Sequence, residues 1–497
     1  MDYKIVNSAL SNLVEPHLRD GIVNDSYTIK TVSALSLLTP NRFDIAFKLF
    51  YLRCKEFNER LANDVYSIHL NVSTGGTFAE FGNKDKVGLE KFKADFSEIL
   101  QSMSGGFNSK KSIVPLCSQH AVANGAHRIA AGIFLNQSVA TVDLDISSVV
   151  QDYKYFRKNG VDEKSMDLAA LEYCRYADNI YLAVLWPAAE ANMADHLKSL
   201  PNIVYSKDVK FSPNGAINLI SVLYNREDWL GAASENYPGA AMKVGECFPS
   251  YELPVKFVLF QSSMEQVSKI KESIRAEANI GKSSVHITDT SEETRSVATA
   301  ILNDNSVHFL NNSNQKWTLE IISNLRQFET HLSKRGLTSD NLVIDGGTAM
   351  QAYGLRKADD VDVICLDEHK QIVSEIPNLD VRSFDGIYHG IDFSDLIYDP
   401  SYYFYFGGFK FISMEQLYSM KQERRESKDI VDSEFIKPLL GTRPIFNKLH
   451  YKSLIFIRIN KYKVKVVKIL NYLGVYKYIR PVYKWVMTLI IGDKLRR

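Results

Sequence analysis

Hydrophobic residues recur at helical spacing through the first 60 residues, and a helical N-terminal region is predicted there. Helical and strand patterns mix between residues 65 and 146, and helical spacing returns over 149–174. Short apolar runs typical of strands follow at 180–186, 256–260, 284–288 and 306–310. Because helical patterns over 264–277 and 291–303 separate the later runs, we predict a small parallel or mixed sheet.

A chain of 497 residues is too long for a single hydrophobic core, so several domains are expected. The predicted fold class is α/β in the broad sense that includes α+β. The asparagine-rich stretch 311–314 is predicted to be a linker into a further domain. The predicted divisions are a helical region (1–60), a first α/β domain (61–148), a central α/β domain with a small sheet (149–315), a further α/β domain (316–445) and a basic amphipathic tail (446–497).

The net charge of +1 conceals an uneven distribution of charge. Residues 448–497 hold thirteen Lys or Arg against one acid, Asp493, which leaves 46 basic and 57 acidic residues in 1–447. In the tail, Ile, Leu, Val, Tyr and Trp alternate with the cations at amphipathic spacing, and Pro481 divides it. Such a stretch suits a helix pair at a membrane surface. Packing on the acidic body and nucleic-acid binding are the alternatives.

The N-terminal sequence, the length of the apolar runs and the cysteine spacing indicate in which cellular compartment the protein resides. The first sixteen residues, MDYKIVNSALSNLVEP, lack the apolar stretch of a signal peptide, and no run of about 18 apolar residues predicts a membrane span. The five cysteines are scattered without CxxC spacing, which disfavours a disulfide framework and a cysteine zinc site. We therefore expect a cytoplasmic protein whose tail contacts the inner membrane surface.

The stretch GGTAMQAYGLRKADDVDV, residues 346–363, is the most informative motif. Gly346 and Gly347 follow an apolar run and allow close approach of a backbone turn, and Thr348 begins a short predicted helix. Thirteen residues after the glycine pair, Asp360 and Asp362 fall on one face of a predicted strand. Two adjacent carboxylates favour a hard cation such as Mg²⁺ between them.

This motif resembles the nucleotidyltransferase superfamily, in which a glycine turn holds a nucleoside triphosphate and a DxD strand holds magnesium. The resemblance covers about 318–440 and implies a third carboxylate from a later strand, for which Asp392 is the candidate. A predicted charged helix follows, with cations and acids three or four positions apart. It carries Lys421, Arg424, Lys428, Asp429 and Asp432.

A second phosphate-binding pattern lies in the segment IVPLCSQHAVANGAHRIAAGIF, residues 113–134. A predicted strand and turn lead into a helix that opens with Gly125, Ala126, His127 and Arg128. The glycine allows a close approach, and the helix start and basic side chains offer donors to an anion.

This second pattern resembles the G-x-H-R turn of the ParB/sulfiredoxin superfamily, over about residues 60–147. The family includes small-molecule kinases, so the resemblance implies ATP binding. Asn124 stands where Asp is frequent, and Ala126 excludes the cysteine chemistry of sulfiredoxin. A kinase of this kind needs a base for the acceptor hydroxyl, and Glu80 is the candidate.

Together the two resemblances imply a phosphotransfer enzyme, an ATP-dependent kinase and/or a nucleotidyltransferase. The implied cofactors are Mg²⁺ and ATP or another nucleoside triphosphate. The layout is similar to proteins of bacterial capsule and O-antigen biosynthesis, which implies a sugar, a polyol or a lipid-linked glycan as acceptor. Two alternatives stay open: a ParB-like protein that senses nucleotide or binds nucleic acid, and a toxin-like nucleotidyltransferase that modifies RNA or protein.

Overall fold

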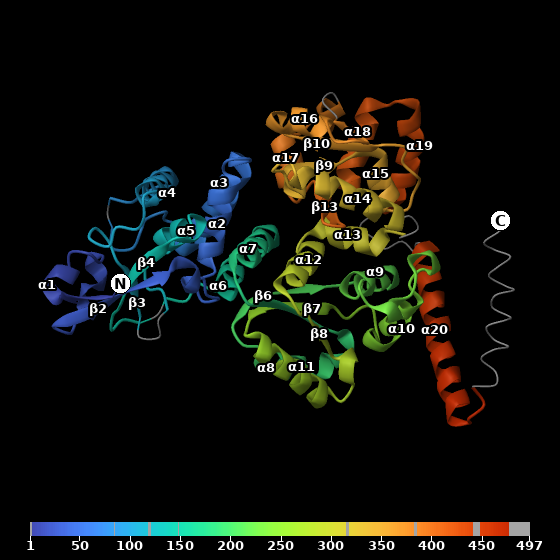
Figure 1. Cartoon of the computed structure of the whole chain (residues 1–497), viewed down its shortest axis with the longest axis horizontal. Helices are drawn as coiled ribbons and strands as arrows, with labels where there is room; N and C mark the ends of the chain where they lie inside the picture. Colours follow the sequence, from blue (N-terminus) through green and yellow to red (C-terminus); the bar gives the residue numbers. More distant parts are fainter. Residues whose placement is uncertain are drawn as a thin grey trace.

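The computed structural model describes residues 2–83, 85–117, 121–147, 149–314, 318–381, 385–440 and 448–476. Helices and strands mix throughout, and the strands form three sheets, so the architecture is α+β. Figure 1 shows three units, each built around one sheet: an N-terminal unit (2–147), a central unit (149–314) and a C-terminal unit (318–440). One continuous hydrophobic cluster includes side chains from all three.

The N-terminal unit contains a four-stranded sheet in the order β1-β2-β4-β3. Its strands are β1 (Tyr3–Val6), β2 (Ser26–Ser33), β3 (Val114–Leu116) and β4 (Ser138–Asp143). β2 pairs with β4 in antiparallel fashion, and β3 runs parallel to β4. The prediction of a separate helical region over 1–60 is therefore wrong. In β2, alternation buries Tyr27 and Ile29 and exposes their neighbours, so this segment belongs to the sheet.

The helices of this unit are α1 (Asn7–Leu10), α2 (Asp44–Cys54), α3 (Glu59–Ser73), α4 (Leu89–Met103) and α5 (Ala126–Phe134). Helix α2 is buried almost all round because α3, α5 and α7 (Glu163–Tyr176) pack on it. α7 follows α6 (Tyr153–Lys158) and joins this unit to the central one.

The central unit contains a sheet in the order β6-β7-β5-β8. Its strands are β5 (Ile180–Leu185), β6 (Ile203–Val209), β7 (Val255–Gln261) and β8 (Val285–Ile287). Every pairing in it is antiparallel, so the prediction of a parallel or mixed sheet is wrong. The helices are α8 (Met193–Ser199), α9 (Pro213–Leu223), α10 (Pro238–Cys247), α11 (Met264–Ala278), α12 (Ser291–Ile301) and α13 (Asp304–Asn312).

The apolar run 306–310, predicted as a strand, lies inside helix α13. The Asn303 side chain caps this helix by accepting a hydrogen bond from the Ser306 N–H, and Asp304 adds an acid to the first turn. Phe309 and Leu310 are buried, and Phe309 stacks on Phe404 of the C-terminal unit. The N-terminal cap and the packing of Phe309 and Leu310 stabilise residues 306–310 as a helix and not as a strand.

The C-terminal unit contains a mixed sheet in the order β11-β10-β9-β13-β12. Its strands are β9 (Leu342–Ile344), β10 (Val361–Cys365), β11 (Leu379–Val381), β12 (Tyr403–Phe406) and β13 (Phe409–Ile412). Its helices are α14 (Thr318–Ser333), α15 (Gly346–Ala352), α16 (Asp367–Ser374), α17 (Phe393–Tyr398), α18 (Met414–Arg424) and α19 (Ser427–Ile436). β10 lies between β9, which is antiparallel to it, and β11, which is parallel to it.

The basic tail begins with one long helix, α20 (Lys448–Tyr472), which packs on α9 and α10 of the central unit. Pro481 and the rest of 477–497 lie outside the described residues. Among the helices that the structure describes, none combines the length and apolar character needed to cross a bilayer.

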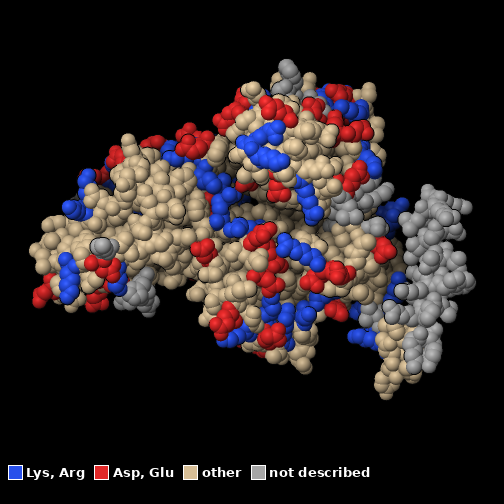
Figure 2. All heavy atoms as spheres, viewed as in Figure 1, with Lys and Arg blue, Asp and Glu red and all other residues tan. Residues whose placement is uncertain are grey.

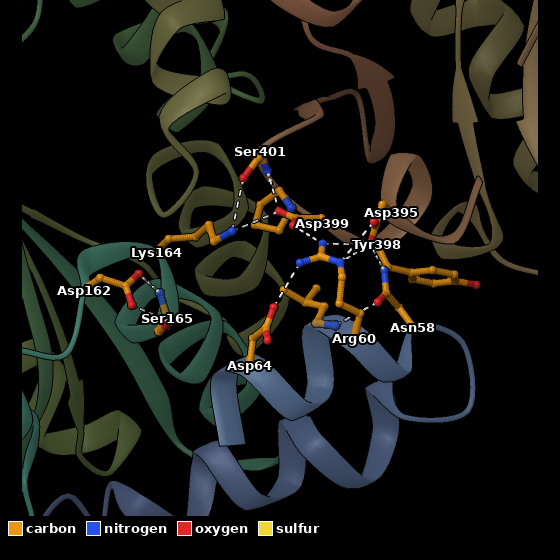
Figure 3. A network of polar contacts seen from close by, with 12 residues as sticks. Asn58, Arg60, Asp64, Asp162, Lys164, Ser165, Asp395, Tyr398, Asp399 and Ser401 are labelled. Carbon is orange, nitrogen blue, oxygen red and sulfur yellow. Dashed lines mark hydrogen bonds and ion pairs between the residues drawn. The ribbon is translucent and has the colours of Figure 1, made fainter. Parts of the chain in front are cut away.

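A polar network joins the N-terminal and C-terminal units (Figure 3). Arg60 at the start of α3 contacts Asp395 at 2.8 Å and Asp399 at 3.0 Å, and Lys164 of α7 contacts Asp399 at 3.3 Å. Burial raises the pKa of Asp399. The N–H of Ser401 and the two cations outweigh this, so the pKa lies below its ordinary value.

Replacing Asp399 by Asn should therefore lower the free energy of unfolding at neutral pH, by about 1–2 kcal/mol, because two cations lose a buried partner. The carboxylate has a depressed pKa in the folded state, so it stabilises the protein above about pH 4, and this contribution is lost as pH falls. Urea unfolding of both proteins at several pH values measures the difference, which should shrink on acidification.

The control is Asp64→Asn. Asp64 also pairs with Arg60, at 2.9 Å, but its side chain is 56% exposed. Its loss should change the stability by no more than about 0.5 kcal/mol. Equal losses in the two variants would show that the network contributes no more than a surface ion pair.

Candidate functional site

The site is built on the turn between β9 and α15. Asp345 follows β9, and Gly346 has a φ of +62°, a conformation that favours glycine. A Cβ at Gly346 would lie 2.3 Å from Oδ2 of Asp362. The Asp345 N–H donates to the carbonyl of Asp362 at 2.8 Å. The missing side chain thus lets the β10 carboxylate lie directly against the turn.

Three carboxylates gather at this edge of the sheet. Asp360 precedes β10, Asp362 lies in it, and Asp380 lies beside Asp362 on the parallel strand β11. One oxygen of each lies within 4.8 Å of the others. Asp362 is buried, whereas Asp360 and Asp380 are exposed. The structure therefore brings the two predicted aspartates together and adds a third that the sequence did not point to.

Asp392, the predicted third carboxylate, is not in a strand. It occupies the N-cap position of helix α17, after the short 3-10 helix Asp385–His389. Among the described residues it does not belong to the carboxylate cluster. The placement of Asp392 in a strand is thus wrong, because the run that looked strand-like contains two helical turns. The alternation Leu379-Asp380-Val381 was the available signal, but a three-residue strand is too short to recognise.

A wall of cations faces the cluster across a cavity of about 450 Å³. The cavity is lined by the glycine turn, the β10 aspartates, and Arg356, Lys421, Arg424 and Lys428. The predicted single charged helix is two helices, because Arg425 ends α18 with a φ of +54° and Glu426 caps α19. The bend brings the cations and acids of the two helices into contact.

The wall is held by buried ion pairs. The Lys421 ammonium lies 3.0 Å from Asp429 and 2.8 Å from Asp432. Arg424 also pairs with Asp429, at 2.8 Å, and Arg356 pairs with Asp432 at 2.7 Å. Burial raises the pKa of Asp429, but Arg424 and Lys421 outweigh it and lower the pKa to about 2. Lys428 is more exposed, with 56% of its side chain accessible.

A buried chain of polar groups supports the turn from behind. His389 Nε2 lies 3.1 Å from Oδ2 of Asp345, and the Gln416 side chain donates to the His389 carbonyl at 2.8 Å. Burial raises the pKa of Asp345. The contact with His389 and the Gly346 N–H outweigh this and hold the pKa below its ordinary value. Within the described part of the chain, Oδ1 of Asp345 is buried without a hydrogen-bond partner.

These features fit a divalent cation. Carboxylate oxygens are the ligands that Mg²⁺ prefers, and a buried carboxylate oxygen without a partner is costly unless something charged lies near it. Asp360, Asp362 and Asp380 are the residues that would hold the ion. Thr348, predicted to bind phosphate at the start of the helix, does not line this cavity, and its hydroxyl donates to the carbonyl of Asp360 at 2.8 Å. A Cβ at Gly347 would press on the Arg356 guanidinium at 3.1 Å.

The second predicted site is arranged differently. Gly125 is the left-handed N-cap of α5, with a φ of +94°, and Ala126 is buried behind it. The Arg128 guanidinium folds back on Gly125 and bonds to Ser112, to the Ile113 carbonyl at 3.0 Å and to Glu15 at 2.5 Å. These donors are therefore used within the protein.

His127 and Glu80 also have partners. His127 Nε2 lies 2.8 Å from the Tyr66 hydroxyl, its ring packs on Phe96, and burial lowers its pKa well below the ordinary value. Glu80 contacts Lys86 at 3.1 Å and accepts from Asn83. Among the described residues, no contact joins Glu80 to His127 or Arg128.

Neither a scan of protein-family models nor searches of curated proteins and of solved structures find a match.

Proposed function

We propose that the C-terminal unit is a magnesium-dependent nucleotidyltransferase centred on Asp360, Asp362 and Asp380. The observation that carries the proposal is the group of three carboxylates on two paired strands, with ligand oxygens within 4.8 Å of one another. The glycine turn and the cationic wall both line the cavity beside this group. A phosphate chain needs cations and close backbone approach, and the cavity offers both.

Each residue has a defined task in this proposal. Asp360, Asp362 and Asp380 hold Mg²⁺, which when bound neutralises phosphate charge and aligns the reacting oxygens. Gly346 and Gly347 leave room for the triphosphate at the turn. Lys428 and the partly exposed Arg356 attract its phosphates, and Arg424, which pairs with Asp429, lines the cavity beside them. Lys421 is a positioning residue, because its ammonium is committed to Asp429 and Asp432.

In the transfer, an acceptor hydroxyl oxygen forms a bond to the α-phosphorus, and the bond from that phosphorus to the bridging oxygen breaks. Pyrophosphate leaves with this oxygen. The Asp380 carboxylate, which is exposed and belongs to the cluster, would take the hydroxyl proton. The acceptor class is a sugar, a polyol or a lipid-linked glycan.

The N-terminal unit supports a second activity less well. ATP-dependent phosphorylation there would need Arg128 and His127 to bind phosphate, and both are committed to contacts inside the unit. Nucleotide sensing by Arg128 and His127 is disfavoured for the same reason, because their polar atoms already bond to other groups of the unit. A toxin-like transfer to RNA or protein would use the same carboxylates as the proposed reaction and differs from it in the acceptor.

The first test removes the metal ligands. Asp360→Asn/Asp362→Asn should weaken binding of nucleoside triphosphate with Mg²⁺ by about 100-fold or more, because the ion loses two charged ligands. Titration calorimetry with the four common triphosphates measures this. The matched control is Asp392→Asn, which changes a nearby aspartate outside the cluster and should bind like the parent. Unchanged binding in the double variant would refute the proposed site.

The second test moves one ligand without removing it. Gly346→Ala should lower nucleotidyl transfer by about 100-fold, because the new Cβ displaces the Asp362 carboxylate from the turn. The control is Gly336→Ala, which has a similar φ of +73° but nothing within 4 Å of the added Cβ. Both variants should lose about 1 kcal/mol of stability from backbone strain, and only the first should lose turnover. Equal activity in the two would argue against a role for the turn.

A further inference from the structure

Helix α20 is fixed in rotation about its own axis by contacts to the central unit. Ser453, Ile457 and Asn460 are buried against it, and Ser453 Oγ donates to Oδ1 of Asn214 at 3.2 Å. His450 Nε2 lies 3.1 Å from the Asn311 carbonyl. The side chains on the opposite side of the helix therefore have a defined direction, away from the protein body.

That opposite side carries an apolar stripe. Its members are separated by three or four positions, so at about 100° per residue they fall within an arc of about 80°. Their exposed fractions lie between 41% and 68%. The stripe consists of Tyr451, Ile455, Ile459, Tyr462, Val466 and Ile469. Figure 1 shows that the C-terminal half of α20 extends beyond the central unit, so this part of the stripe stands clear of α9 and α10.

The charges on α20 are all of one sign. Between residues 448 and 472 there are seven Lys or Arg and no Asp or Glu. By the same helical geometry, Lys452 and Lys463 fall along one border of the stripe, and Arg458 and Lys465 fall along the other. Figure 2 shows a few separate blue cations along this edge of the molecule, above a tan lower end. An apolar strip bordered by cations matches the depth profile of an anionic bilayer surface.

We propose that this face of α20 is a docking surface for an anionic lipid bilayer. The stripe enters the headgroup boundary, and the bordering cations bind lipid phosphates. The helix lies along the surface, in agreement with the absence of a membrane-crossing helix among the described residues. The docking goes beyond the proposed transfer chemistry and does not rest on it. Taken together with that chemistry, it would hold the acceptor site of the C-terminal unit near lipid-borne substrates.

Three other partners could cover the stripe: a second copy of the chain, the segment 477–497, and nucleic acid. The charges and apolar side chains of α20 disfavour each of them. In a helix pair formed by two copies, the bordering positions would bring Lys and Arg together with no acid to pair with them. The remaining chain, 477–497, carries six Lys or Arg and one Asp, so it also has the same sign. Nucleic acid would use the cations but would leave the Ile and Val side chains exposed.

Vesicle flotation of the full chain tests the proposal. We expect binding to vesicles of phosphatidylcholine with phosphatidylglycerol and at least tenfold weaker binding to phosphatidylcholine alone. The variant Ile459→Gln/Val466→Gln/Ile469→Gln should lose binding by at least tenfold for each apolar contact removed, that is about 1000-fold in all. Lys463→Gln/Lys465→Gln should weaken binding about tenfold and reduce its dependence on salt.

The matched control is Ile430→Gln on α19, which changes an isoleucine that is 63% exposed and lies outside the stripe, and it should float like the parent. Asp360→Asn/Asp362→Asn should also float normally, so failure of the transfer proposal would not imitate failure of this one. Full binding by the stripe variant would overturn the proposal. So would a dimer in light scattering that the stripe variant abolishes, or nucleic-acid binding lost only in the lysine variant.

Discussion

The ammonium group of Lys421 lies between two carboxylates in a place that water hardly reaches. Its side chain is 2% exposed, and those of Asp429 and Asp432 are 0% and 3% exposed. Charges buried this deeply are tolerated only when they are paired, and removing one partner leaves the others uncompensated. Arg424 and Arg356 extend the pairing to the turn that carries Gly347. The position of α18 and α19, and with it the shape of the cavity, depends on this balance.

On the other side of the cavity, carboxylates lie next to one another. There, acids from two paired strands gather beside the buried carboxylate of Asp345. His389 contacts one oxygen of Asp345, and the other has no hydrogen-bond partner among the described residues. The buried cations of one wall are thus paired within the protein, whereas the facing wall gathers three carboxylates. This asymmetry is what a site for a metal complex of a polyanion requires.

The sequence predicted the parts of this site that are close together along the chain. Gly346, Gly347, Asp360 and Asp362 belong to one short stretch, and turn chemistry and strand alternation are local properties. Asp380 could not be predicted because its place depends on which strand pairs with β10. The two errors over 306–310 and around Asp392 have a similar cause. Apolar runs of five residues fit a strand or a helix equally well, and caps and tertiary packing decide between them.

The order of the units along the chain has one more consequence. The chain leaves the central unit after α13 and returns to it at α20, and the two crossing points touch, since His450 contacts the Asn311 carbonyl. The C-terminal unit is therefore an insertion within a discontinuous central domain. An inserted domain with adjacent ends can be excised and the flanking chain rejoined by a short peptide, because little distance has to be spanned. The C-terminal unit with its carboxylate site could therefore be deleted from the chain while the central domain and α20 remain one continuous polypeptide.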